Sequence, residues 1–379
     1  MLFATSTRAI WGGTTPYVGV VEMLTQLRRR FPVAVISNHA KPHWFDSYFT
    51  PIGVEFARIE GRQDGAAIRD WAKSGSSPIA MHRVVVLAAS QDDVAMAKNS
   101  GSVFVSAGWG ADSYAQKIGL KVERPDEVFD IVRLVSEWDG GSYFHAEGAG
   151  YTVDALCDAS SNRRVSPEQQ GFGQAVTGVV KGGAAKLNQL LAVATGSLMR
   201  SGLAEKDKLL WGVYPSSSIR EPDCEVLSDF THRLRTTVSR VHFAKVGEPL
   251  FFRIRQAPKR SGGESADRTN PRDEVETIRL NPFYKTRVRG KNVVVLDDFT
   301  THGVSMGVAA GFLRKAGAAS VTGITLGKFG NCLKCYDIQL TSSPFAAVAS
   351  GQWSSKTASW DVEEPSSDNQ SALRELLEL

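Results

Sequence analysis

Apolar runs alternate with amphipathic stretches over the first 138 residues of the chain. Short apolar runs predict buried strands, and stretches with apolar positions at helical spacing predict helices. The predicted strands lie at 32–38, 83–90 and 102–108, and the predicted helices at 18–31 and 92–100, the second of which stops at Gly101. Because strands separated by helices are typical of a parallel sheet covered on both faces, residues 1–138 are expected to form an α/β domain.

The remainder of the chain repeats this alternation less regularly. The glycine-rich segment Trp138–Gly150 is the preferred domain boundary. Beyond it we expect a mainly helical region at 151–200, strands at 209–215, 292–298 and 320–327, and helices at 225–239 and up to Arg314. The predicted fold class is therefore α/β with two doubly wound parallel-sheet domains, at 1–138 and 150–350. A polar tail at 351–379 follows, which ends in the short amphipathic helix SALRELLEL.

Composition and charge disfavour some classes of protein and indicate the kind of ligand. The chain has 379 residues, is 42% hydrophobic and contains four cysteines, which are too few for a disulfide framework and favour a cytoplasmic protein. No apolar run approaches the roughly 20 residues of a membrane span, and the N-terminus does not resemble a signal segment. Residues 141–349 carry 27 basic and 19 acidic side chains, a surplus that suits an anionic ligand such as phosphate or nucleic acid.

Much of this positive charge lies at 253–291, where 11 lysines or arginines accompany five acidic residues. The segment has little to bury, so we expect a mobile basic loop there. A solvated linker without a functional role is the alternative.

The most informative segment is Val293–Ala318, which begins with the apolar run VVVL. Asp297 and Asp298 close this predicted strand, and hydroxyl residues and a glycine precede the following helix. A turn between a parallel strand and a helix N-terminus is a common phosphate site. The alternative is a strand that merely ends in a polar turn, although two carboxylates are costly to place there without a use.

The sequence LDDFTTHG resembles the signature of type I phosphoribosyltransferases. The resemblance implies that Asp297 and Asp298 hold the ribose hydroxyls of phosphoribosyl pyrophosphate, and that Mg²⁺ associates with them indirectly, through the ribose. It also implies a 5-phosphate loop made of Thr300, Thr301, His302, Gly303, Val304 and Ser305. His302 departs from the family pattern, which has a threonine at this position.

Further segments resemble the ComF-like branch of that family. These are VVKGGAAKLNQLLA at 179–192, GVYPSSS at 212–218 and the basic stretch APKRSG…TIRLNPF. By this resemblance Tyr214, Pro215 and Ser216 contact pyrophosphate, and Lys259 and Arg260 shield the leaving group. The implied activity transfers ribose 5-phosphate to or from a nitrogenous base or amine, with Mg²⁺ and phosphoribosyl pyrophosphate.

Residues 1–138 resemble the haloacid-dehalogenase-like phosphatases. VAVISNHAKP, with Ser37, is similar to the second motif of that family, and VVVLAASQDD to its last motif, in which Asp93 remains but Ala88 and Ala89 replace a glycine-aspartate pair. No aspartate precedes Asp46, so the nucleophile of the family is missing from the first strand, which offers Thr5, Ser6 and Thr7 instead. We therefore expect an inactive domain kept for docking or binding; an accidental likeness is the alternative.

The other signals are weaker. Cys332 and Cys335 form a CxxC pair without two further zinc ligands in sequence. His145 is expected to be an ordinary polar residue, as is His242. Trp211 and Tyr214 either stack on a base or pack in the core.

Two other functions stay open. The phosphoribosyltransferase-like domain could be a non-catalytic sensor of a nucleotide or phosphoribosyl pyrophosphate, since fold alone does not fix function. The chain could also be an effector of a bacterial stress or defence system that acts on nucleotides or nucleic acid. A protein partner would bind through the N-terminal domain or the C-terminal helix, and no membrane association is expected.

Overall fold

The chain divides into two compact units. In the computed structural model the first unit comprises residues 1–140, 188–205 and 232–240, and the second comprises 141–187, 206–231 and 241–379. The residues that the structure describes are 1–74, 77–138, 141–183, 186–217, 226–238, 247–257, 269–358, 361–363, 365–367 and 370–377.

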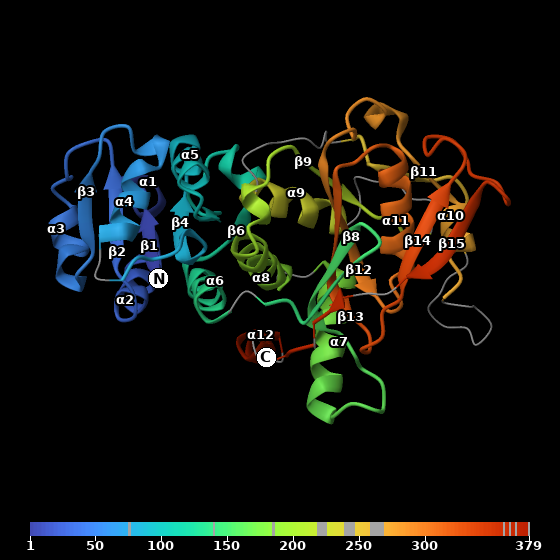
Figure 1. Ribbon diagram of the computed structural model, residues 1–379. Helices are drawn as coiled ribbons and strands as arrows, with labels where there is room; N and C mark the ends of the chain where they lie inside the picture. The colour runs from blue at the N-terminus through green and yellow to red at the C-terminus, as the bar shows by residue number, and fades with distance from the viewer. Residues whose placement is uncertain are drawn as a thin grey trace. The chain divides into compact units, whose positions relative to one another are not determined.

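The first unit contains a six-stranded sheet in the order β3-β2-β1-β4-β5-β6, and every neighbouring pair is parallel (Figure 1). The strands are β1 (Leu2–Thr5), β2 (Val33–Ser37), β3 (Glu55–Arg58), β4 (Val84–Ala88), β5 (Val103–Ala107) and β6 (Leu120–Val122). The helices are α1 (Thr7–Ile10), α2 (Val20–Arg28), α3 (Phe45–Tyr48), α4 (Ala66–Ser74), α5 (Gln91–Ser100) and α6 (Pro125–Glu137). This parallel sheet with helices confirms the expected α/β class.

Local sequence explains these elements. Every residue of β2, β4 and β5 is buried, as expected for central strands made of continuous apolar runs. Helix α5 begins with a capping box in which Ser90 and Asp93 bond each other's backbone N–H groups. It ends at Gly101, whose φ of 78° is the left-handed conformation that terminates many helices. The predicted strands and helices of this region are confirmed to within a few residues.

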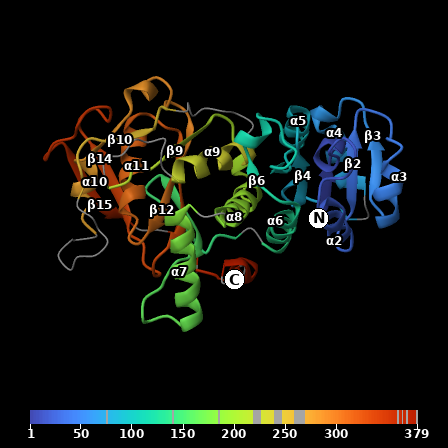
Figure 2. The ribbon, with the colours of Figure 1, turned by 180° about the vertical axis from the view of Figure 1, so that it is seen from behind.

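Two later helices also group with the first unit. Helix α8 (Leu187–Arg200) lies beside α6 in both views (Figures 1 and 2), and the Trp138 indole donates a 2.9 Å hydrogen bond to Ser197. Helix α9 (Val226–Val238) ends in this unit, where the Thr236 hydroxyl accepts a 3.0 Å bond from the backbone N–H of Gly119.

The second unit contains a sheet in the order β16-β7-β8-β13-β12-β9. Strands β8, β13, β12 and β9 are parallel, whereas β7 and β16 are antiparallel. The bounds are β7 (Phe144–Gly148), β8 (Tyr151–Asp158), β9 (Leu209–Val213), β12 (Asn292–Thr300), β13 (Ser320–Lys328) and β16 (Asp361–Val362). The expected parallel sheet is therefore found only in the four strands from β8 to the β9 edge, and the antiparallel strands at the other edge were not predicted.

Two expectations about 138–200 were wrong in part. The region 151–200 begins with strand β8 rather than with a helix. Buried and partly buried residues alternate along the first half of β8, which is the pattern of a strand and not of a helix. The glycine-rich segment before it holds β7 and a tight hairpin turn, in which Ala149 and Gly150 have φ angles of 47° and 77°. These glycines therefore mark a turn between paired strands as well as a change of unit.

Helices and two small ribbons complete the second unit. The helices are α7 (Pro167–Gly182), α10 (Arg272–Val275), α11 (Val304–Lys315) and α12 (Ser371–Leu377), and the ribbon strands are β10 (Phe251–Arg253) with β11 (Ile278–Leu280) and β14 (Cys335–Leu340) with β15 (Trp353–Ala358). The described parts of 253–291 are thus ordered, which corrects the expectation of one long mobile loop. The tail also contains strands, and the apolar residues of α12 are buried within the chain. None of the described helices has the length and apolar character needed to cross a bilayer.

Candidate functional site

A cavity of about 820 Å³ opens at the carboxyl ends of β9, β12 and β13 in the second unit. Its walls contain every described residue that the sequence predicted for the ribose, phosphate and pyrophosphate site. The lining residues are Ser161, Asn162, Lys181, Tyr214, Pro215, Ser216, Ser217, Arg253, Glu274, Asp297 to Ser305, and Phe329 to Cys332. The cavity therefore brings together the segments around 214 and 300, which are far apart in sequence. Lys259 and Arg260 lie outside the described residues.

The two carboxylates at the end of β12 form the first wall of the cavity, and neighbouring backbone N–H groups hold them in place. Residues Val293–Leu296 are buried, and Asp297 and Asp298 become partly exposed as the strand leaves the core. Asp297 Oδ1 accepts a 2.9 Å bond from the N–H of Asp298, and Asp298 Oδ1 accepts a 2.7 Å bond from the N–H of Phe299. Over the residues that the structure describes, neither carboxylate forms an ion pair, so their remaining oxygen lone pairs are available to a ligand.

The electrostatic environment of Asp297 disfavours its charged form. Burial raises the pKa of this carboxyl well above its usual range, and the negative charges of Asp298 and, more weakly, Glu274 raise it further. A group that donates hydrogen bonds, or a nearby cation, would reverse this effect.

The turn after β12 forms the second wall of the cavity. The Thr300 hydroxyl accepts a 3.2 Å bond from the N–H of Gly303, whose φ of 81° starts helix α11. A Cβ on Gly303 would lie 3.0 Å from Leu333 Cδ1 and 3.1 Å from the carbonyl oxygen of Lys334, and these tight contacts add to the positive φ in favouring glycine. Among the residues that the structure describes, no side chain caps the first turn of α11. Its N–H groups, the positive end of the helix dipole and the hydroxyls of Thr301 and Ser305 therefore form a candidate anion site in the cavity wall.

The loop after β9 forms the third wall. Tyr214 donates its N–H to the carbonyl of Leu296 at 2.7 Å, which joins this loop to β12. The Tyr214 ring is only 4% exposed and its hydroxyl donates a 2.8 Å bond to Glu274. Burial, with the charge of Glu274, raises the pKa of Tyr214 well above its usual value. Trp211 is also buried, so both aromatic side chains pack in the core, the second of the two alternatives that the sequence left open.

Arg253 and Glu274 also line the cavity and were missed by the sequence analysis. Their side chains are 3% and 7% exposed and form a 2.8 Å ion pair. Both lie within the basic stretch 253–291, where the many exposed charges gave no reason to single them out. The one available signal was the position of Arg253 directly after the apolar residues LFF.

Lys328 is a third residue that the sequence analysis missed. It is completely buried at the end of β13, opposite Thr300 in the strand register. Its ammonium donates to the carbonyl groups of Gly330 and Cys332 at 2.8 and 2.9 Å and lies 4.9 Å from the Phe144 ring centre. Burial lowers the pKa of Lys328 to about 8. Lys328 therefore holds the segment that forms the fourth wall of the cavity.

The weaker candidates have ordinary surroundings. Cys332 is an exposed free thiol and Cys335 a buried one, and no group of three or more metal-binding side chains occurs among the described residues. His145 contacts Asp154 at 2.7 Å on β7 and β8, away from the cavity lining, and this contact raises the pKa of His145. His242 lies outside the described residues.

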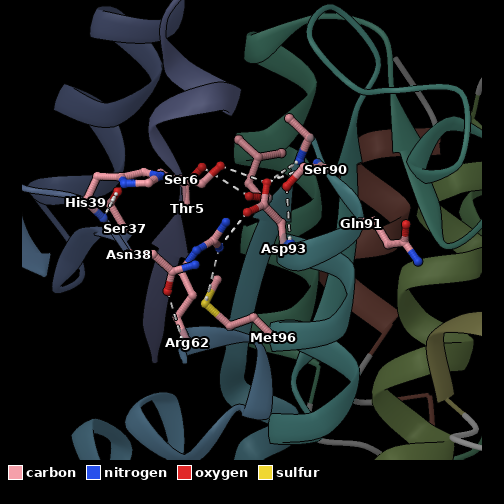
Figure 3. A network of polar contacts seen from close by, with 12 residues as sticks. Thr5, Ser6, Ser37, Asn38, His39, Arg62, Ser90, Gln91, Asp93 and Met96 are labelled. Carbon is pink, nitrogen blue, oxygen red and sulfur yellow. Dashed lines mark hydrogen bonds and ion pairs between the residues drawn. The ribbon is translucent and has the colours of Figure 1, made fainter. Parts of the chain in front are cut away.

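A separate polar cluster lies in the first unit, where the strand order reverses between β1 and β4 (Figure 3). Arg62 and Asp93 form a 2.5 Å ion pair, and Asp93 accepts further bonds from the Ser6 hydroxyl and from the N–H groups of Ala89 and Ser90. Asp93 was predicted here, but Arg62 was not. Of the other residues noted in sequence, the Thr5 hydroxyl bonds the carbonyl of Leu87, and Ser37 accepts a bond from the N–H of His39.

Comparisons with known proteins found no relative of this chain. No family model matches the chain, and no curated protein or solved structure matches it either. Function is therefore inferred from the chemistry and geometry of the cavity.

Proposed function

We propose that the second unit is a phosphoribosyltransferase-like catalytic domain, similar to the ComF-like branch, that uses phosphoribosyl pyrophosphate. The main support for the proposal is that two kinds of binding group lie in one cavity. Two carboxylates, Asp297 and Asp298, share a cavity with the first turn of α11, and among the described residues neither carboxylate has an ion-pair partner and no side chain caps that turn. Vicinal hydroxyls beside a phosphate match this pair of features, because carboxylates accept hydrogen bonds from hydroxyls and helix N-termini bind phosphate.

The residues have distinct roles in the proposed reaction. The bond from ribose C1 to the pyrophosphate oxygen breaks and a bond from C1 to a nitrogen nucleophile forms. Pyrophosphate leaves with the bonding electron pair, and the nitrogen releases its proton to solvent. Asp297 and Asp298 orient the ribose, while Thr300 to Ser305 hold the 5-phosphate. The loop of Tyr214, Pro215 and Ser216 contacts the pyrophosphate. Positive charge that develops on C1 is stabilised by the fixed carboxylates.

The residues present are compatible with Mg²⁺ that arrives with the substrate. Mg²⁺ is usually held by one or two carboxylates together with substrate phosphates, rather than by an all-protein cage. Asp297 and Asp298 are the residues that would hold it, through the ribose, and Mg²⁺ would neutralise charge on the pyrophosphate. Lys259 and Arg260 remain the predicted shield of the leaving group.

We further propose that the first unit is a haloacid-dehalogenase-like domain without phosphatase activity. Asp93 is fully buried, its Oδ2 accepts three hydrogen bonds and its Oδ1 lies in the ion pair with Arg62, so the carboxylate is already engaged by groups of the protein. Docking or binding of a partner is the proposed role of this unit.

The test is release of pyrophosphate from phosphoribosyl pyrophosphate and Mg²⁺ in the presence of a panel of nitrogenous bases and amines. Asp298→Asn is expected to lower turnover by about 100-fold or more. Asp337→Asn is the control, because this carboxylate pairs with Arg314 and does not line the cavity. Tight binding without turnover with any acceptor would favour the sensor, and salt-dependent binding to nucleic acid alone would favour the effector.

A further inference from the structure

The last residue of β10 reaches the loop that lines the cavity after β9. Strand β10 is preceded by Leu250, which packs directly on Gly212 of β9, since a Cβ on Gly212 would lie 2.4 Å from Leu250 Cδ2. This close approach brings Arg253 to the carbonyl groups of Pro215 and Ser216.

The guanidinium of Arg253 uses four of its N–H donors on fixed partners. Nε donates to the carbonyl of Ser216 at 2.8 Å, and Nη2 donates to the carbonyl of Pro215 at 3.0 Å and to Glu274 at 2.8 Å. Nη1 donates to the Thr277 hydroxyl at 2.6 Å. One planar side chain therefore fixes two consecutive carbonyl groups of the loop in a single orientation.

Glu274 links Arg253 to the first residue of the same loop, Tyr214. One carboxylate oxygen accepts bonds from both Arg253 and the Tyr214 hydroxyl, each at 2.8 Å. Three consecutive residues of the loop, from Tyr214 to Ser216, are thus tied to one buried ion pair. Burial of such a pair often adds nothing to stability, because desolvation offsets the attraction between the charges. Its geometry is therefore better explained by positioning than by stability.

We propose that Arg253 and Glu274 are positioning residues that hold the loop of Tyr214, Pro215 and Ser216 in the conformation that receives pyrophosphate. The inference rests on the proposed function, and it adds that the pyrophosphate end of the site depends on this ion pair. The 5-phosphate end depends on Thr300 and Gly303, which Arg253 does not contact.

The experiment compares two ligands by calorimetry in the presence of Mg²⁺. Phosphoribosyl pyrophosphate needs both ends of the site, whereas ribose 5-phosphate needs only the carboxylates and the α11 turn. Arg253→Lys keeps a positive charge beside Glu274 but cannot hold both loop carbonyl groups. It is expected to weaken binding of phosphoribosyl pyrophosphate by about 10- to 100-fold and to leave the affinity for ribose 5-phosphate within about twofold.

Two further variants keep the result interpretable. Arg255→Lys is the matched control, because Arg255 lies two residues away, is 60% exposed and pairs with Glu276 rather than with the loop. The double variant Arg253→Met with Glu274→Gln removes both charges, so it avoids an unpaired buried charge and is expected to show the same selective loss.

Each outcome has a defined meaning. Equal losses for both ligands in folded Arg253→Lys, or no loss for either, would overturn the positioning role. Failure of the wild-type chain to bind either ligand would instead overturn the proposed function.

Discussion

The guanidinium of Arg62 lies 2.5 Å from the carboxylate of Asp93, and the two side chains are only 9% and 0% exposed. Arg62 belongs to a short 3₁₀ helix, Arg62–Asp64, whereas Asp93 lies in the first turn of α5. In open parallel sheets a ligand commonly binds where the strand order reverses. Here that position, next to β1 and β4, is taken by two charges of the protein itself (Figure 3).

Removal of Arg62 is expected to destabilise the first unit strongly. Arg62→Met would leave the Asp93 carboxylate buried without its counter-ion, and the free energy of unfolding is expected to fall by about 3–5 kcal/mol. Urea denaturation measures this change. Arg58→Met is the control, because Arg58 pairs with Glu60 at an exposed position and should cost less than about 1 kcal/mol. Equal effects of the two substitutions would contradict a structural role for the Arg62–Asp93 pair.

Gly303→Ala is expected to weaken phosphate binding strongly. The substitution combines an unfavourable positive φ with contacts to Leu333 and Lys334, so the turn before α11 must shift. Binding of ribose 5-phosphate, measured by calorimetry, should weaken by about 100-fold. Gly290→Ala is a matched control, since its φ is 68° but a Cβ there would meet nothing within 4 Å. Unchanged binding by Gly303→Ala would show that this turn does not hold the phosphate.

Lys328→Met is expected to loosen one wall of the cavity with little effect on overall stability. The carbonyl groups of Gly330 and Cys332 would lose their donor, but a costly buried charge would also be removed. Hydrogen exchange at residues 329–332 should therefore accelerate, while the midpoint of urea denaturation changes little. Lys334→Met, at an exposed position of the same segment, should leave exchange unchanged. Unaltered exchange in Lys328→Met would contradict the role given to this lysine.

The elements that the sequence predicted well are those specified by local patterns. The continuous apolar runs of β2, β4 and β12 match buried parallel strands, because such strands need apolar residues on both faces. The run that ends in Asp297 and Asp298 also predicted the position of the cavity, since the carboxyl ends of neighbouring parallel strands meet at one edge.

The features that the sequence did not predict depend on tertiary contacts. Strand β7 was hidden by the glycines around it, because only its pairing with β8 distinguishes a hairpin from a linker. Arg253 and Lys328 are a buried arginine and a buried lysine, which the sequence cannot distinguish from exposed ones. Their carbonyl and carboxylate partners come from segments tens of residues away or from loops without a motif.

Binding of phosphoribosyl pyrophosphate with Mg²⁺ is expected to strengthen as the pH rises through the raised pKa of Asp297. Burial and the charge of Asp298 favour the protonated form of Asp297 in the free protein, whereas ribose hydroxyls require an accepting carboxylate. Protonation of Asp297 therefore competes with ligand binding. The affinity, measured by calorimetry from about pH 5 to about pH 8, should increase more steeply than ionisation of the ligand's own phosphate groups explains. Asp297→Asn cannot titrate, so its affinity should be lower at high pH and should follow only the ligand. Asp337→Asn, outside the cavity, should keep the wild-type profile. Identical pH profiles for wild type and Asp297→Asn would show that this carboxylate does not contact the ribose.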